Sequence, residues 1–153
     1  MVAERFKILV DELAQQLSVK LEPDTHNACR LQFKDGLVLS MQPNSTLDTL
    51  RVVVEIATPG QGRYREAILK EALRANGLPY PHVGTFAFSP KTDMLLLCDQ
   101  LPMEELSGQR LAEIIKQLSD KAREWKESIA RGETPVLRGV QSARASEGVF
   151  GLK

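Results

Sequence analysis

The sequence lacks the features by which a function is most easily recognised. Its two cysteines, Cys29 and Cys98, are too few and too far apart for a disulfide framework or a metal site. It has no apolar run long enough for a signal peptide or a membrane span. Its 20 basic and 20 acidic residues cancel, so no long-range field attracts nucleic acid or anionic lipid. We therefore expect a bacterial cytoplasmic protein with no metal, no nucleic-acid partner and no membrane insertion.

A catalytic or cofactor-binding motif is also missing. The nearest approach is the loop of residues 60–65, where Gly60 and Gly62 follow a predicted strand and open a predicted helix, as in a phosphate-binding loop. Arg65 occupies the third glycine position of such a motif, and a strand-to-helix turn by itself accounts for both glycines. We predict no enzyme, no catalytic residue and no cofactor. A small phosphate- or nucleotide-binding enzyme that uses Arg63 and Arg65 is the less favoured alternative.

The sequence does contain apolar residues whose spacing changes regularly between the spacing typical of a helix and that typical of a strand. Its 153 residues and 42% hydrophobic content fit one domain with a core of its own. Residues 3–17 have apolar positions three and four apart, which is typical of an amphipathic helix. Residues 29–34 and 37–42 alternate around Asp35-Gly36, which predicts a β-hairpin with positive φ angles in its turn. Residues 50–57 are apolar on both faces, which predicts a strand that is central in the sheet or covered on both sides.

The second half of the sequence also predicts helices and strands, with two strands between two helices. Residues 64–76 predict a helix that is closed by Gly77 in the left-handed conformation. Two strands follow, at residues 83–88 and 94–101. A long amphipathic helix then begins near residue 103 or 107 and continues to residue 130.

Residues 131–153 are small, polar and basic, and we expect them to form a flexible tail. The prediction for residues 1–130 is a single α+β domain with the order α-β-β-β-α-β-β-α. Its antiparallel, twisted sheet is flanked by helices.

The order of these elements and three sequence segments resemble the class I type III secretion chaperones, the CesT-like family of Tir chaperones. The segments are LRANG at the end of the second helix, FAFSPKTDMLLLCDQLP as a strand-turn-strand unit, and AREW near the end of the last helix. The similarity covers residues 3–130 and is strongest over residues 68–125. It implies a homodimer that binds the N-terminal segment of a secreted effector in extended form. The effector stays soluble and export-competent, and the chaperone meets the export apparatus indirectly.

By position, the resemblance also implies two sets of site residues. In this family an effector adds a strand to a sheet edge and lays apolar side chains into surface patches. The first helix and the hairpin would bind the effector through Phe6, Leu9, Leu13, Leu31, Phe33, Leu39 and Met41. The second helix and the next strand would form the dimer interface through Ile68, Leu69, Ala72, Leu73, Val83 and Phe86. A core position is the competing interpretation for each of these residues. The alternative function is a regulatory protein of the same fold that sequesters an activator or another chaperone.

Overall fold

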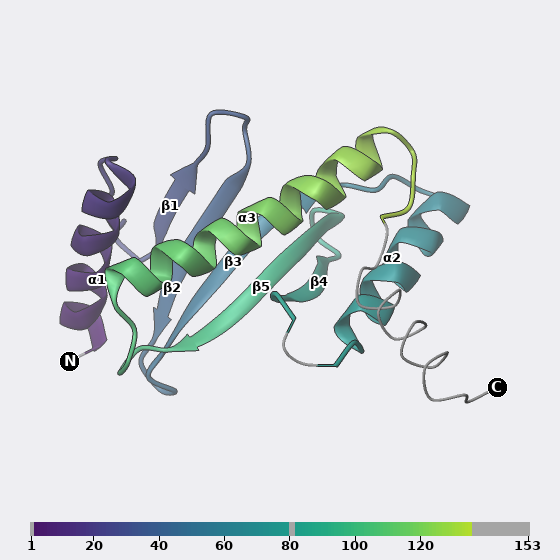
Figure 1. Cartoon of the computed structure of the whole chain (residues 1–153). Helices are drawn as coiled ribbons and strands as arrows, with labels where there is room; N and C mark the ends of the chain where they lie inside the picture. Colours follow the sequence, from purple (N-terminus) through teal and green to yellow (C-terminus); the bar gives the residue numbers. More distant parts are fainter. Residues whose placement is uncertain (1, 80–81, 136–153) are drawn as a thin grey trace, which may run out of the picture.

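The predicted order of helices and strands is present in the computed structural model, which describes residues 2–79 and 82–135 (Figure 1). The predicted flexible tail therefore lies mostly outside the described residues. The elements are α1 (Val2–Leu17), β1 (Cys29–Gln32), β2 (Val38–Asn44), β3 (Thr49–Ala57), α2 (Arg63–Asn76), β4 (Thr85–Ser89), β5 (Met94–Pro102) and α3 (Gly108–Ala130). No helix within the described ranges is both long and apolar enough to cross a membrane.

The five strands form one antiparallel sheet with the order β1-β2-β3-β5-β4. The predicted meander of the first three strands is confirmed, and β3 lies at the centre of the sheet as its composition indicated. Its buried residues alternate along the strand, at Leu50, Val52, Val54 and Ile56. Within the part of the chain that the structure describes, β1 and β4 are the two edges of the sheet, where a strand from another chain can be added.

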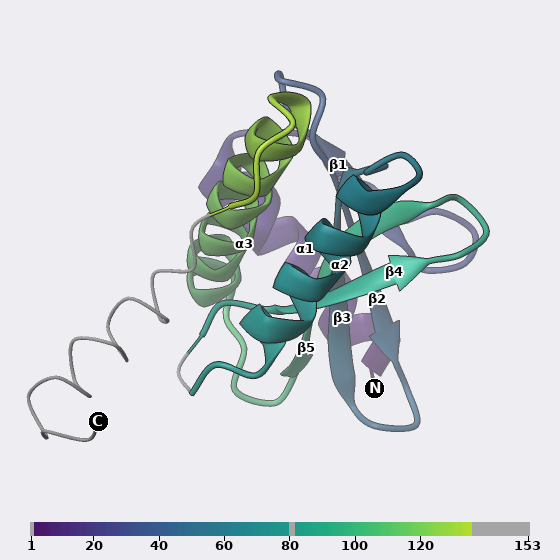
Figure 2. The ribbon, with the colours of Figure 1, turned by 90° about the vertical axis from the view of Figure 1, so that its right-hand side faces the viewer.

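Helices α1 and α3 cover one face of the sheet, and α2 lies beside β4 (Figure 2). Side chains of α1 and α3 and the inward residues of all five strands form a single apolar core. The C-terminal half of α3 reaches the β4 edge, where the Trp125 and Phe86 rings are 4.2 Å apart. Lys121 donates to the carbonyl oxygen of Val83 at 2.6 Å, and burial lowers the pKa of its amine. No helix among the described residues covers the opposite face of the sheet.

The two covering helices meet where α3 begins. The backbone N–H of Gly108 donates to the Glu12 carboxylate of α1 at 2.8 Å, and Ser107 accepts a hydrogen bond from the N–H of Arg110 at 3.1 Å. Two of the N–H groups that a helix start leaves unpaired are thus satisfied, one of them by another helix. A negative carboxylate at this end of α3 is also favoured by the helix dipole.

The predicted β1–β2 hairpin is present, but its turn differs from the expected one. The N–H of Phe33 donates to the carbonyl oxygen of Leu37 at 2.8 Å, and the N–H of Gly36 donates to that of Phe33 at 3.0 Å. This is a three-residue loop, in which a single residue takes a left-handed conformation. Gly36 is that residue, with φ of 91°, and Asp35 does not have a positive φ. The expectation of positive φ at both positions was wrong.

The end of α2 also differs from the prediction. Gly77 has φ of −86° and lies in the right-handed region, so the expected left-handed cap is absent. The last turn of the helix tightens instead. The N–H of Gly77 donates to the carbonyl oxygens of Leu73 and Arg74, and the N–H of Leu78 donates to that of Ala75. Because these bonds satisfy the terminal carbonyl groups, no left-handed residue is required.

Candidate partner-binding site

The seven side chains predicted to bind an effector belong to the apolar core that α1 shares with the β1–β2 hairpin, or pack against it. Six of them are buried in the core of the chain itself, namely Phe6, Leu9, Leu13, Leu31, Leu39 and Met41. Phe33 is half-buried, with the Arg123 guanidinium 4.8 Å from the centre of its ring. These residues shape and support this end of the molecule, and a partner would contact the backbone and the exposed side chains around them.

The free edge of β1 lies at this end of the sheet. Along two antiparallel strands, opposite residues alternate between pairs that exchange backbone hydrogen bonds and pairs that do not. Phe33 and Leu37 form a hydrogen-bonded pair, and this fixes which residues of β1 bond to β2. The N–H and C=O groups of Arg30 and Gln32 therefore point away from β2. They have no backbone partner among residues 2–79 and 82–135. The edge thus offers two donors and two acceptors to an extended peptide.

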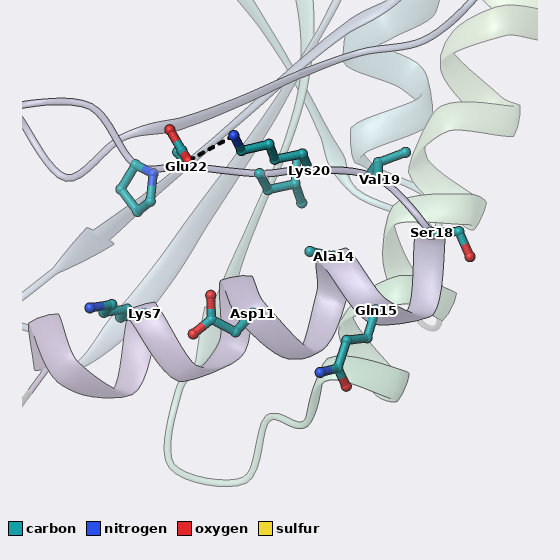
Figure 3. A pocket seen from close by; sticks show the side chains of 10 residues that line it. Lys7, Asp11, Ala14, Gln15, Ser18, Val19, Lys20 and Glu22 are labelled. Carbon is teal, nitrogen blue, oxygen red and sulfur yellow. Dashed lines mark ion pairs between the residues drawn. The ribbon is translucent and has the colours of Figure 1, made fainter.

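A groove of about 660 Å³ lies between α1 and the connection that leads to β1 (Figure 3). Lys20 and Glu22 lie on the same side of the extended connection, with 3.5 Å between Nζ and Oε1. The groove is lined by apolar and charged side chains of both signs: Lys7, Asp11, Ala14, Gln15, Ser18, Val19, Lys20, Leu21, Glu22 and Pro23. Such a lining suits a polypeptide segment of mixed composition better than a small anion or cation.

An ion pair fixes the β1–β2 hairpin to α3. The Nε of Arg123 lies 2.6 Å from Oδ2 of Asp35, and the same guanidinium covers the Phe33 ring. Because a planar guanidinium can pair and stack at once, Arg123 holds the hairpin at two points. Its hydrogen bond to Asp35, helped by the N–H of Leu37, keeps the pKa of that carboxyl below its ordinary value.

This ion pair gives a pH-dependent prediction. Since the folded pKa of Asp35 is lowered, the stabilisation by Arg123 is present above the unfolded pKa and is lost as the pH falls through the folded pKa. An NMR titration of the Asp35 carboxyl carbon is expected to show a midpoint below that of an ordinary aspartate. Arg123→Gln should raise the midpoint. The matched control is Arg110→Gln, because Arg110 pairs with Glu113 on the exposed side of α3; an equal rise in this control would contradict the assignment.

The residues predicted to form a dimer interface gather around a small apolar groove between α2 and β4. Ile68, Ala72 and Phe86 are buried, whereas Leu69 and Val83 are half-buried. Leu73 is the outermost, with 71% of its surface exposed. The groove measures about 180 Å³ and is lined by Leu69, Ala72, Leu73, Asn76, Phe86, Ala87, Phe88 and Leu95. Four of the six predicted residues thus line the groove, whereas Ile68 and Val83 lie outside its lining.

The β4 edge differs from the β1 edge because a side chain occupies part of it. The Asn76 amide donates to the carbonyl oxygen of Phe86 at 3.0 Å and accepts from its N–H at 2.7 Å. This reciprocal pair satisfies the backbone groups that an added strand would use at Phe86. A strand from another chain therefore meets fewer free groups at β4 than at β1.

The uncovered face of the sheet was not predicted from the sequence. A shallow hollow of about 510 Å³ lies there, over β3, β4 and β5, lined by Arg51, Val53, Thr85, Ala87, Leu96, Cys98, Asp99 and Gln100. Burial raises the pKa of the Cys98 thiol, so this cysteine is a poor nucleophile and contributes apolar surface. The signal in the sequence was the second apolar face of residues 50–57, together with Leu96 and Cys98.

The glycine-containing loop before α2 is engaged in structural contacts. The Arg65 guanidinium lies 4.8 Å from the centre of the Phe88 ring and 3.6 Å from the Asp93 carboxylate. Arg65 therefore fastens α2 to the β4–β5 turn. Gly62 precedes α2 with φ of 91°, a conformation that explains its glycine without a phosphate. The contacts of Arg65 count against the alternative of a phosphate- or nucleotide-binding enzyme.

A sequence-family model and solved structures match this chain. The model described as the Tir chaperone protein (CesT) family matches residues 8–126. No curated protein sequence matches the chain.

The similar structures include three complexes. The first is the crystal structure of the Yersinia pestis type III secretion chaperone SycH with a stable fragment of YscM2. It has 26% identity and a TM-score of 0.61, and the match covers 76% of this chain and 96% of that one. The HopA1–SchA chaperone–effector complex has 20% identity and a TM-score of 0.67, covering 82% and 95%. The ExoT–SpcS complex from Pseudomonas aeruginosa has 18% identity and a TM-score of 0.59, covering 77% and 94%. The last two show the fold alone.

Proposed function

The chain belongs to the Tir chaperone protein (CesT) family of type III secretion chaperones, and on that premise we propose how it acts. It binds the N-terminal segment of a secreted effector in extended form. The bound segment stays unfolded, soluble and export-competent until the export apparatus removes it. The chaperone acts by binding alone, in the cytoplasm, and has no catalytic step.

The free edge of β1 is the observation that carries this proposal. The outward groups of Arg30 and Gln32 can each donate and accept a hydrogen bond, as an added strand requires. The groove between α1 and the connection to β1 offers further surface to the same polypeptide segment. Among similar proteins, SchA is solved in a complex with the effector HopA1, and SycH with a fragment of YscM2.

The proposal includes a homodimer formed through α2 and β4. A two-fold axis makes an interface self-complementary, so each copy must offer both a protruding group and a recess. The exposed Leu73 and the adjoining apolar groove are such a pair on one chain. In the dimer, Leu73 of each copy packs into the groove of the other, and Leu69 extends the apolar contact.

The identity of the partner tests the proposed function. Capture from the native cytoplasm with the full-length chain, followed by mass spectrometry, is expected to recover a secreted protein. Truncation should map the binding to its N-terminal region. Recovery of a transcriptional activator or another chaperone would support the regulatory alternative instead. A chain that runs as a monomer and captures no protein with an extended N-terminal region would contradict the proposal.

The binding edge is tested at one position. Gln32→Pro removes an N–H that points away from β2, so the sheet itself loses no bond. We expect the affinity for the mapped segment to fall by about 10-fold, which corresponds to about 1.4 kcal/mol, the scale of a lost hydrogen bond and its neighbours. Gln32→Ala keeps the N–H and is the matched control. Equal affinities of the two variants, measured by calorimetry, would count against the β1 edge as the site.

A further inference from the structure

The connection between α1 and β1 ends in a β-hairpin turn that has only one strand. The N–H of Asp24 donates to the carbonyl oxygen of Ala28 at 2.8 Å, and the N–H of Asn27 donates to that of Asp24 at 3.1 Å. Asn27 has φ of 58°. The turn from Phe33 to Leu37 has the same two bonds and the same left-handed third loop residue. In that second turn the geometry joins two paired strands, whereas residues 20–23, here called the strap, are not paired with β1.

The turn places the strap in register with the free groups of β1. Pairing that starts at Asp24 and Ala28 brings Glu22 opposite Arg30, and the next bonded pair is residues 20 and 32. Arg30 and Gln32 are the residues whose N–H and C=O groups point away from β2. Pro23, which has no N–H, falls at a non-bonded position where none is needed. Four backbone hydrogen bonds are therefore available to a strap that lies against β1.

Burial and charge along the strap match those along β1. Lys20 and Glu22 are exposed while Leu21 between them is buried, and in β1 Leu31 is buried between two exposed residues. Residues that lie opposite each other in neighbouring strands point their side chains to the same face of the sheet. The Glu22 carboxylate would therefore lie beside the Arg30 guanidinium. In addition, the proline at position 23 restricts Glu22 to extended conformations. An unrelated loop has no reason to alternate in phase with the neighbouring strand.

We propose that the strap closes onto β1 as a sixth strand when no partner is bound, and that a partner strand must displace it. The open strap in the structure is held at its start by α1, because the N–H of Val19 donates to the carbonyl oxygen of Ala14 at 3.0 Å. Closing requires a rotation of the chain at Lys20 and leaves the Asp24 turn unchanged. The closed strap covers the sheet edge, which protects a cargo-free chaperone against edge-to-edge association.

The closing of the strap does not depend on the proposed function, but its role as a competitor of the effector rests on it. A partner strand that replaces the strap takes over the same bonds to Arg30 and Gln32. The strap also indicates which side chains the partner strand should carry. They are an apolar side chain at the place of Leu21 and an acidic side chain opposite Arg30.

Amide hydrogen exchange of the full-length, partner-free chain tests the closing. We expect the N–H groups of Arg30 and Gln32 to exchange at least 10-fold more slowly than in Glu22→Pro, after correction for intrinsic rates. Proline at position 22 removes an N–H that would bond to β1. Glu22→Ala keeps this N–H and should exchange like the wild type. The N–H of Leu31, which bonds to β2, should exchange at one rate in all three proteins and so report an intact sheet.

If the N–H groups of Arg30 and Gln32 exchange equally fast in all three proteins, the proposal that the strap closes onto β1 is wrong. This measurement uses no effector, so it remains decisive if the proposed function fails. Once an effector segment is mapped, Glu22→Pro should bind it several-fold more tightly than Glu22→Ala does. Slow exchange in the wild type with no gain in affinity for Glu22→Pro would overturn the competition while leaving the proposed function intact.

Discussion

Gly108→Ala is expected to lower the free energy of unfolding by about 3 kcal/mol, the upper end of the usual cost of overpacking. A Cβ at this position would lie 2.3 Å from Cβ of Glu12 and 3.0 Å from its backbone carbonyl carbon. Neither atom is the end of a flexible side chain, so α1 and α3 must move apart. Their separation would also break the hydrogen bond from Gly108 to the Glu12 carboxylate.

Thermal and urea unfolding of the full chain measure this effect, with an expected fall in Tm of about 10 °C for a protein of this size. Gly77→Ala is the matched control. Gly77 has a right-handed backbone, and an added Cβ would meet its nearest neighbour at 3.5 Å, an ordinary contact. The control should change stability by about 0.5 kcal/mol or less. A stability of Gly108→Ala within this range would contradict the close approach of the two helices.

Leu73→Asp is expected to convert the proposed homodimer into a monomer. Leu73 is 71% exposed in the single chain, so its replacement should leave the fold of the monomer intact. In the dimer the aspartate would enter an apolar groove without a partner for its charge, which is costly. We expect the dissociation constant of the dimer to rise by at least about 100-fold, as for a central interface residue.

Sedimentation over a range of concentrations measures the dimer equilibrium, and circular dichroism checks the fold. Ile8→Asp is the control because Ile8 is a large apolar residue on α1 with 58% of its surface exposed, outside α2 and β4. This variant should remain dimeric. An unchanged dimer in Leu73→Asp, or dissociation in both variants, would rule out the interface at α2 and β4.

The order of helices and strands could be predicted because the spacing of apolar residues within each element is a local property of the sequence. Apolar spacing identified all three helices, and alternation identified the strands to within a few residues. The conformations of Asp35 and Gly77 could not be predicted in the same way. A turn residue needs a positive φ only where the backbone carbonyl groups nearby would otherwise lack hydrogen-bond donors. The hydrogen-bond pattern of the folded turn decides this, and it cannot be read from the local sequence.

The candidate site was less accessible to sequence reasoning. Periodicity shows that Phe6, Leu9 and Leu13 share an apolar face, but it does not show whether that face packs on the chain's own sheet or on a partner. In the structure this face packs on the chain's own sheet. The position of β1 at an edge also depends on the strand order, which places β5 between β3 and β4. Non-consecutive pairing of this kind leaves no local signal.

The two edges of the sheet fit different roles in the proposed chaperone. At β4, Asn76 occupies the backbone groups of Phe86 and leaves an apolar groove for side-chain contact. At β1, the outward groups of Arg30 and Gln32 remain available for a strand. A dimer built at one edge therefore leaves the other edge of each copy open to an effector.

The most direct test of the proposed function is the conformation of the bound effector segment. NMR of an isotopically labelled segment, mapped as above and bound to the full-length chaperone, reports its backbone conformation and its neighbours. We predict extended chemical shifts along the segment and intermolecular contacts from its backbone to Arg30 and Gln32 of β1. A bound segment that folds into a globular unit, or one whose backbone makes no contact with β1, would contradict the account.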